Sequence, residues 1–301
     1  ASGGKMKLFD LHCDTAYEMR KRRMHLDKNS LMVSLSGASK IEKYCQIMAI
    51  WSDCKKNDEE CFKEYNLILG SLNHELELNG ICDFPISVED ARILHGNIER
   101  VEKLYSDGVA VITPVWGGES CIGGAFDTEA GLTDFGKEAM NKASKLGIIL
   151  DISHSSLKTA SEIADISERH GNPVIATHSC AYGIYSHPRN LRTDQFKRIK
   201  ESGGIVGLSF CRYHLTDSPN CGAEDVLRHI DYYLSLGGEK ILCIGADMDG
   251  APMPDGIDGI ASMPNIYKLI EKEFGREIAD RITWENANGF SEKYFNKRII
   301  K

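Results

Sequence analysis

The chain has 301 residues, with 36 lysines and arginines against 44 aspartates and glutamates, so its formal net charge is -8. This acidic balance argues against nucleic acid or an acidic membrane surface as a partner, because both need a clustered basic face. The ten cysteines lack the spacing of a small disulfide scaffold, and no apolar run is long enough to span a bilayer. We therefore expect a cytoplasmic protein with one large domain over residues 1–301.

Eight short apolar runs alternate with helix-like segments along the chain. The predicted strands cover Met6–Leu11, Cys45–Trp51, Ile81–Val88, Val109–Trp116, Ile148–His154, Pro173–His178, Ile205–Phe210 and Ile241–Asp247. Most of these runs are rich in β-branched residues and nearly unbroken, which is typical of strands buried on both faces of a parallel sheet. The alternation of such strands with helices predicts an α/β fold, a (β/α)₈ TIM-type barrel.

Three further segments complete the predicted architecture. The polar stretch Arg20–Lys43 is predicted to be mostly loop. Between the third and fourth strands, one helix is predicted to carry Ile93–Leu104 toward the core. After the eighth strand, residues 264–301 are predicted to form a carboxyl-terminal helical extension that packs on the barrel.

The stretch from Ile148 to Asn190 is the most informative part of the sequence. Its two buried strands end at His154 and His178, and a helix-length segment joins them. Because neighbouring parallel strands end on one rim of a barrel, the two imidazoles would lie side by side. Each imidazole could be a satisfied core histidine, but the pair favours a metal site at the carboxyl end of the sheet.

Other strand ends carry further ligand-type side chains. His12 and Asp14 fall on one face of the first strand because side chains alternate with a period of two. Glu89 follows the third strand, although it could instead begin the next helix. Asp247 ends the eighth strand, and the following Asp249–Gly250 pair is assigned to a turn. Such a set could hold two divalent ions with one shared carboxylate and a bridging hydroxide between them.

Other chemistries find little support in the sequence. The glycine-rich loop Gly117–Gly124 lacks the spacing and context of a nucleotide-binding loop. There is no Gly-x-Ser-x-Gly elbow, and none of the cysteines has a catalytic signature. Arg189, beside Pro188, could be an ordinary helix-flanking charge or a clamp for a substrate carboxylate.

The chain resembles the renal (membrane) dipeptidase family of zinc metallopeptidases, within the amidohydrolase-type barrels. The motifs that carry the resemblance are Asp10–Asp14, Gly131–Gly136, Leu150–His154, Ala176–Ser179, His187–Leu191 and Gly245–Gly250. The resemblance implies a dipeptidase with two Zn²⁺ ions per chain, a dipeptide substrate that often carries a D-residue at its carboxyl side, and a possible homodimer.

The resemblance also assigns roles to individual residues. It implies that His12 and Asp14 bind one zinc ion, that His154 and His178 bind the other, and that Glu89 bridges the two. It further implies that Asp247 is a general acid/base and that Arg189 contacts the substrate carboxylate.

Two positions depart from the family pattern. Glu89 stands in Glu89-Asp90-Ala91, where the family usually has Glu-Gly-Gly. Trp116 takes the place of a histidine that contacts the substrate carbonyl, and its indole can donate one hydrogen bond but cannot carry a charge. We predict that Trp116 contacts the substrate, with His187 or a residue of the Gly117–Gly124 loop as alternatives for the role of the missing histidine. The alternatives are a hydrolase of another small amide or lactam on the same dimetal site, and a barrel that binds a small ligand without turnover.

Overall fold

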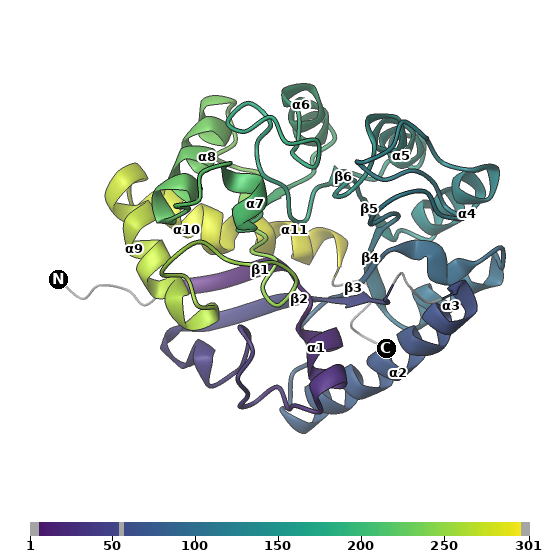
Figure 1. Ribbon diagram of the computed structural model, residues 1–301, viewed down its shortest axis with the longest axis horizontal. Helices are drawn as coiled ribbons and strands as arrows, with labels where there is room; N and C mark the ends of the chain where they lie inside the picture. The colour runs from purple at the N-terminus through teal and green to yellow at the C-terminus, as the bar shows by residue number, and fades with distance from the viewer. Residues whose placement is uncertain (1–5, 54–56, 296–301) are drawn as a thin grey trace.

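The computed structural model describes residues 6–53 and 57–295, and within them eight parallel strands form a barrel surrounded by helices (Figure 1). The strands are β1 Lys7–Cys13, β2 Lys43–Trp51, β3 Ile86–Glu89, β4 Val109–Thr113, β5 Ile149–Asp151, β6 Val174–Ile175, β7 Val206–Leu208 and β8 Leu242–Ile244. Their order is β6-β5-β4-β3-β2-β1-β8-β7, and a parallel bridge between Ala176 and Val206 joins the two ends. The predicted (β/α)₈ barrel is confirmed.

Helices follow the strands as a barrel requires. They are α1 Thr15–Arg22, α2 Asp58–Leu78, α3 Glu99–Ser106, α4 Asp134–Lys145, α5 Leu157–Arg169, α6 Thr193–Glu201, α7 Arg212–Leu215, α8 Ala223–Ser235, α9 Met263–Phe274, α10 Arg276–Asp280 and α11 Asn286–Tyr294. Helix α5 shows why the sequence forms them. The Ser156 hydroxyl accepts a hydrogen bond from the Thr159 amide, Ile163 is buried, and Gly171 leaves the helix with φ +67°.

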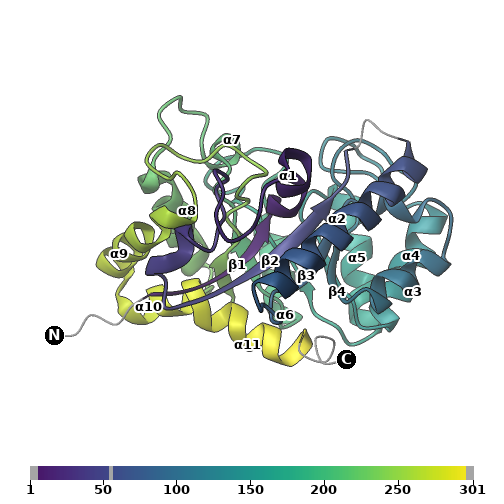
Figure 2. The same cartoon turned by 90° about the horizontal axis from the view of Figure 1, so that it is seen from below.

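The carboxyl-terminal helices cover one end of the barrel. Figure 2 shows α11 across this end, while α1 and α7 lie at the opposite end. The Asn286 side chain anchors α11 because its Nδ2 donates to the carbonyls of Glu239 (3.0 Å) and Leu242 (2.8 Å) at the start of β8. The predicted helical extension is therefore present, and residues 296–301 of it lie outside the described residues. Since α1 follows β1 and α7 follows β7, the open end is the carboxyl end of the strands.

Several boundaries differ from the prediction, and the predicted ends of β4, β5, β6 and β8 each lie three residues beyond the observed ends. Strand β3 begins at Ile86 and not at Ile81, because Pro85 has no N–H to donate to a neighbouring strand. The helix expected over 93–104 is two pieces, the 3₁₀ turn Ala91–Leu94 and α3, since His95 (φ 34°) and Gly96 (φ 66°) adopt left-handed backbone between them. The predicted loop from Arg20 contains the last turn of α1 and a 3₁₀ turn over Gly37–Lys40.

Close packing brings β6, β7 and β8 together below the open end. Gly207 of β7 and Gly245, just after β8, both face the carbonyl oxygen of Thr177, and a Cβ atom on either would overlap that oxygen. The Ser179 amide donates to the Gly207 carbonyl at 2.8 Å. These contacts fix the backbone on both sides of His178.

The cysteines and the helices relate to the expected absence of a disulfide scaffold and of a membrane span. All nine cysteines in the described part of the chain are free thiols, and most are buried. None of the helices that the structure describes is both long enough and apolar enough to cross a membrane. The cytoplasmic location stays a prediction.

Candidate metal centre

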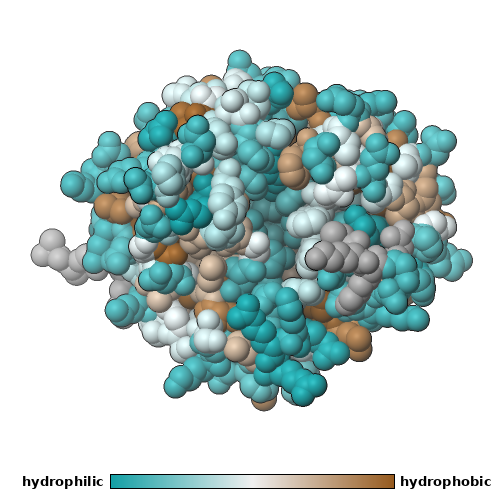
Figure 3. Space-filling view, in the orientation of Figure 1, coloured by the Kyte–Doolittle hydropathy of each residue, from teal (hydrophilic) through white to brown (hydrophobic). Residues whose placement is uncertain are grey.

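The parallel register aligns the strand ends at the open end of the barrel. Trp51 at the end of β2 pairs with Glu89, which pairs with Thr113 at the end of β4. On the other side, the Asp247 amide donates to the His12 carbonyl at 3.1 Å. Figure 3 views this end of the molecule, whose centre is hollowed and bordered mainly by hydrophilic side chains.

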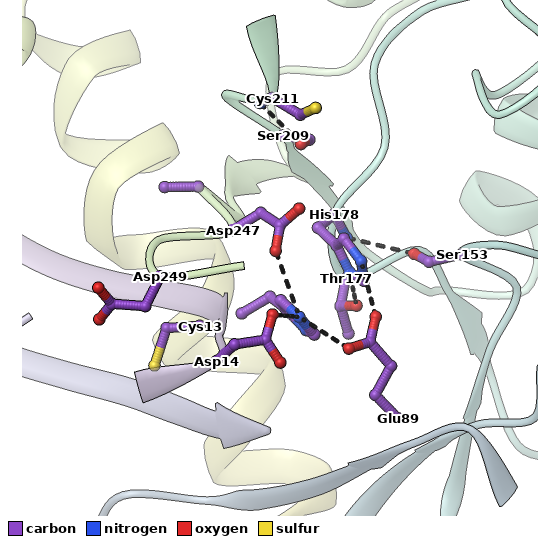
Figure 4. Close-up of polar contacts among 12 residues, drawn as sticks. Cys13, Asp14, Glu89, Ser153, Thr177, His178, Ser209, Cys211, Asp247 and Asp249 are labelled. Atoms are coloured by element: carbon purple, nitrogen blue, oxygen red, sulfur yellow. Dashed lines mark hydrogen bonds and ion pairs between the residues drawn. The ribbon is translucent and has the colours of Figure 1, made fainter. Parts of the chain in front are cut away.

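One half of the site forms around the His12 imidazole. Its Nε2 lies 3.5 Å from Asp14 Oδ2, 3.6 Å from Glu89 Oε2 and 3.6 Å from Asp247 Oδ1, and it has no hydrogen-bond partner within residues 6–53 and 57–295. Figure 4 shows the side chains of Asp14, Asp247 and Glu89 converging on one region, whereas Asp249 points away from it. Oxygen and nitrogen atoms that converge in this way, none of them closer than 3.5 Å to His12 Nε2, leave space for a cation among them.

The other half forms around His154 and His178. The two Nε2 atoms lie 2.9 Å apart, and Glu89 Oε1 lies 3.0 Å from the first and 3.3 Å from the second. Glu89 therefore directs one oxygen to each half of the site. As the last residue of β3 it does not begin a helix, because the following 3₁₀ turn is capped by Asp90, so that alternative is wrong.

The hydrogen-bond pattern assigns the proton on each of these two imidazoles. His154 Nδ1 lies 3.0 Å from the Trp116 carbonyl oxygen, which can only accept, so Nδ1 carries the proton. His178 Nδ1 lies 2.8 Å from Thr177 Oγ1, whose own proton is donated to Asp151 Oδ2 at 2.5 Å. The hydroxyl must therefore accept from His178 Nδ1.

Both Nε2 atoms consequently present lone pairs to each other and to a carboxylate oxygen. Three acceptors within 3.3 Å and no proton among them repel one another unless a cation lies between them. A satisfied core histidine would have a donor at this position. The donor set of His154, His178 and Glu89 fits a divalent metal ion such as zinc.

Two of the converging side chains depend on unusual backbone. His154 (φ 66°) and Asp247 (φ 65°) are left-handed, a conformation that costs energy for residues with a side chain and that clusters at functional sites. Gly250 makes close approach possible, because a Cβ there would overlap the carboxylates of Asp14 and Asp247. Asp249 has the turn role predicted for it and accepts from Thr15 Oγ1 at 2.6 Å.

Burial dominates the electrostatics of the site. Desolvation raises the pKa of Asp14 to about 6, with the Glu89 charge adding to the shift. Desolvation also raises the pKa of Asp247 well above its usual range, and the nearby Asp14 and Glu89 charges add to it. For Glu89, burial alone would raise the pKa, but the imidazoles, His12 first, lower it well below its usual range.

These three carboxylates form ion pairs only with histidines in the part of the chain that the structure describes. Buried negative charge without a lysine or arginine partner is stabilised by a bound cation.

The Arg189 guanidinium is buried nearby, and its hydrogen-bond partners among the described residues are neutral. Its Nη1 donates to Ser179 Oγ at 3.1 Å and its Nη2 to the His178 carbonyl at 2.8 Å, while Nε has no partner in the part of the chain that the structure describes. Burial lowers the pKa of this guanidinium from its ordinary value. A buried positive charge with a spare donor is suited to bind an anion.

Trp116 lies beside the metal-ligand candidates but beyond the end of its strand, since β4 ends at Thr113. Its ring lies 6.1 Å from the His154 ring and 5.4 Å from that of Trp51, which is on β2. Sequence reasoning missed the role of the Trp116 backbone carbonyl, and it missed Asp151 and Thr177. The available signal was a hydroxyl residue directly before His178 and an aspartate three residues before His154.

Comparison with known sequences places this barrel in a family. The family model for membrane dipeptidases, peptidase family M19, matches residues 74–289. An uncharacterized protein from the pqqA 5' region of Klebsiella pneumoniae is 29% identical over 215 residues, which cover 66% of this chain and 77% of that protein. An uncharacterized dipeptidase of Schizosaccharomyces pombe is 30% identical over 205 residues, covering 64% of this chain and 48% of that protein.

Solved structures share the fold along almost the whole chain. A dipeptidase of family M19, dipeptidase AC, has a TM-score of 0.89 at 23% identity and covers 97% of this chain and 99% of its own. A metallo peptidase from Rhodobacter sphaeroides, liganded with a phosphinate mimic of the dipeptide L-Ala-D-Ala, has a TM-score of 0.87 at 22% identity. The match covers 97% of this chain and 100% of that protein. The chain therefore belongs to the membrane dipeptidase family, peptidase family M19, and is a hydrolase that acts on peptide bonds.

Proposed function

We propose that this protein is a zinc-dependent dipeptidase that holds two Zn²⁺ ions and cleaves dipeptides, including those with a D-residue at the carboxyl end. The observation that carries the proposal is the convergence of His154 Nε2, His178 Nε2 and Glu89 Oε1 within 3.3 Å without a shared proton. Membership of peptidase family M19 supports the reaction class.

The ligands divide into two sets. His12 and Asp14 would hold one ion, and His154 and His178 the other. Glu89 would be shared, because its Oε2 faces His12 and its Oε1 faces the other two imidazoles. When bound, the ions would supply a water of lowered pKa as nucleophile, the source of the bridging hydroxide expected above, and would polarise the scissile carbonyl.

Asp247 would move the proton. Its carboxylate stands beside His12 and Asp14 at the edge of the site, with a side chain that is 13% exposed, so a substrate can reach it. Burial and the neighbouring carboxylates raise its pKa, which suits a group that takes a proton from the attacking water and passes it to the leaving amine.

Arg189 would bind the substrate carboxylate. The guanidinium has a spare donor at Nε and no carboxylate partner among the described side chains, so a dipeptide carboxylate would complete its hydrogen bonding. A carboxylate bound here would orient the peptide carbonyl toward the two ligand sets.

A second candidate substrate class follows from Trp116. The indole lies beside His154 where the family has a histidine, and one neutral donor would bind a substrate carbonyl less strongly than a charged group. A small amide or lactam on the same site is therefore the alternative substrate, and a barrel that binds ligand without turnover is the alternative outside catalysis.

The test is hydrolysis of a dipeptide panel by zinc-loaded protein. L-Ala-L-Ala and L-Ala-D-Ala are compared because the Rhodobacter protein holds a mimic of the second. We expect about two zinc ions per chain, turnover of at least one peptide, and loss of both zinc and turnover in His178→Ala. Bound zinc with turnover only of lactams or other amides would show that these compounds, and not dipeptides, are the substrates. Bound zinc without any turnover would favour the ligand-binding barrel.

A further inference from the structure

We propose that Thr177 and Asp151 are positioning residues that keep the proton of His178 on Nδ1 and so keep its Nε2 free to bind a metal. The proposal rests on the proposed metal site and names the residues that control the tautomer of one of its histidines. Neither residue contacts the position where a substrate or metal would lie in this arrangement. Both act through the imidazole of His178.

Asp151 is a saturated hydrogen-bond acceptor at the end of β5. Its Oδ1 accepts from the amides of Ser153 (2.9 Å) and Thr177 (3.0 Å). Its Oδ2 accepts from the hydroxyls of Thr113 (2.6 Å) and Thr177 (2.5 Å). Asp151 and Thr177 are both fully buried, so water does not compete for these bonds.

This carboxylate determines the direction of the Thr177 hydroxyl. The hydroxyl has one proton, and Asp151 takes it, so Thr177 Oγ1 can only accept from His178 Nδ1. The imidazole of His178 is thereby fixed in one tautomer and one ring orientation. Hydrogen-bond partners of metal-binding histidines generally have this effect.

His154 is held differently. Its Nδ1 donates to the backbone carbonyl of Trp116, which has no proton and cannot change its role. Of these two adjacent imidazoles, only His178 therefore depends on a hydroxyl whose direction can be reversed. This difference makes the proposal testable one ligand at a time.

Asp151→Asn would reverse the relay without removing atoms from the core. The amide oxygen would face the two backbone N–H groups, and the amide nitrogen would donate to the hydroxyls of Thr113 and Thr177. The Thr177 proton would then be free to point at His178 Nδ1, which would move the imidazole proton to Nε2. An aspartate-to-asparagine change behind a histidine can in this way impose the wrong tautomer with the geometry intact.

The first measurement is made on metal-free protein, by long-range proton–nitrogen NMR of the histidine rings, with His178→Asn used to assign the signal. We expect Nδ1–H in the wild type and Nε2–H in Asp151→Asn. A wild-type His178 whose Nδ1 carries no proton, with the ring protonated on Nε2 alone, overturns the proposal, whatever the protein does with metal.

The second measurement is titration with Zn²⁺ in competition with a chromophoric chelator. We expect Asp151→Asn and Thr177→Val to bind one of the two zinc ions about 10- to 100-fold more weakly and the other as tightly as the wild type. Thr177→Ser keeps the hydroxyl and should restore the affinity. Thr113→Val is the matched control, because it removes a donor to the same carboxylate oxygen but does not touch His178.

The outcomes separate the two proposals. A wild type with the Nδ1–H tautomer that binds no zinc refutes the proposed function and leaves the relay standing as a positioning device. A wild type that binds two zinc ions, with Thr177→Val equal to it in affinity, refutes the relay alone. Equal losses in Thr113→Val and Thr177→Val would show a general packing effect and would also refute it.

Discussion

His229 of α8 is a buried group that contributes to the pH dependence of the stability of this barrel. Its side chain is fully buried, its Nδ1 accepts from the Ala181 amide at 2.9 Å, and its Nε2 donates to the Leu215 carbonyl at 2.8 Å. These bonds tie the segments after β6 and β7 to α8, and they require a neutral ring. Burial lowers the pKa of His229 to about 4 from an ordinary 6.5.

The sign of the effect follows from proton linkage. Below pH 6.5 the unfolded chain binds a proton on His229 that the folded protein does not bind until about pH 4. The contribution of His229 to the free energy of unfolding is therefore fully present above pH 6.5 and is lost as the pH falls toward 4. The whole pKa difference corresponds to about 3 kcal/mol, of which about 2 kcal/mol is lost between pH 7 and pH 5.

Urea unfolding of metal-free protein at pH 7 and pH 5 measures this contribution. His229→Asn removes the titrating group while its amide oxygen can still accept from the Ala181 amide. The variant is expected to be less stable at pH 7 but to lose about 2 kcal/mol less than the wild type on going to pH 5. His74→Asn, on the exposed face of α2, is the control for losing one histidine and should follow the wild type. Equal pH dependence in wild type and His229→Asn would refute the reasoning.

Three further predictions concern the site. Asp247→Asn should lower kcat by about 10²- to 10⁴-fold with zinc content unchanged, as measured by steady-state kinetics and metal analysis; loss of zinc would instead make Asp247 a ligand. Arg189→Met should raise the KM for a dipeptide by about tenfold or more. It should not raise the KM for the same peptide with an amidated carboxyl end, and an equal rise for both peptides would contradict the carboxylate contact. Gly250→Ala should weaken zinc binding, because its Cβ would overlap the carboxylates of Asp14 and Asp247. Gly70→Ala is the control and should not weaken it, because the space around Gly70 is open. Tight zinc binding in Gly250→Ala would contradict the prediction and show that the carboxylates can move.

The sequence determined the architecture and predicted most of the side chains that the structure brings together at the open end, because both follow from local patterns. Buried strands are short, apolar and β-branched, so they could be located; His12 lies within β1, and His154, His178 and Asp247 each follow the last residue of their strand by three residues. Where local signals compete, the prediction was wrong. The third strand was extended upstream of Pro85, although a residue without an N–H could have marked its beginning.

Only the tertiary structure decided how the site residues face each other and where their protons lie. The position of Glu89 between the two halves of the site depends on distances to His12 and His154, which come from other parts of the barrel. The tautomer of His178 depends on Asp151, which is 26 residues from Thr177 in sequence but within hydrogen-bond distance of it in the barrel. The physical reason is that a strand's apolar pattern is encoded in its own residues, whereas a hydrogen bond across a barrel depends on the register between strands.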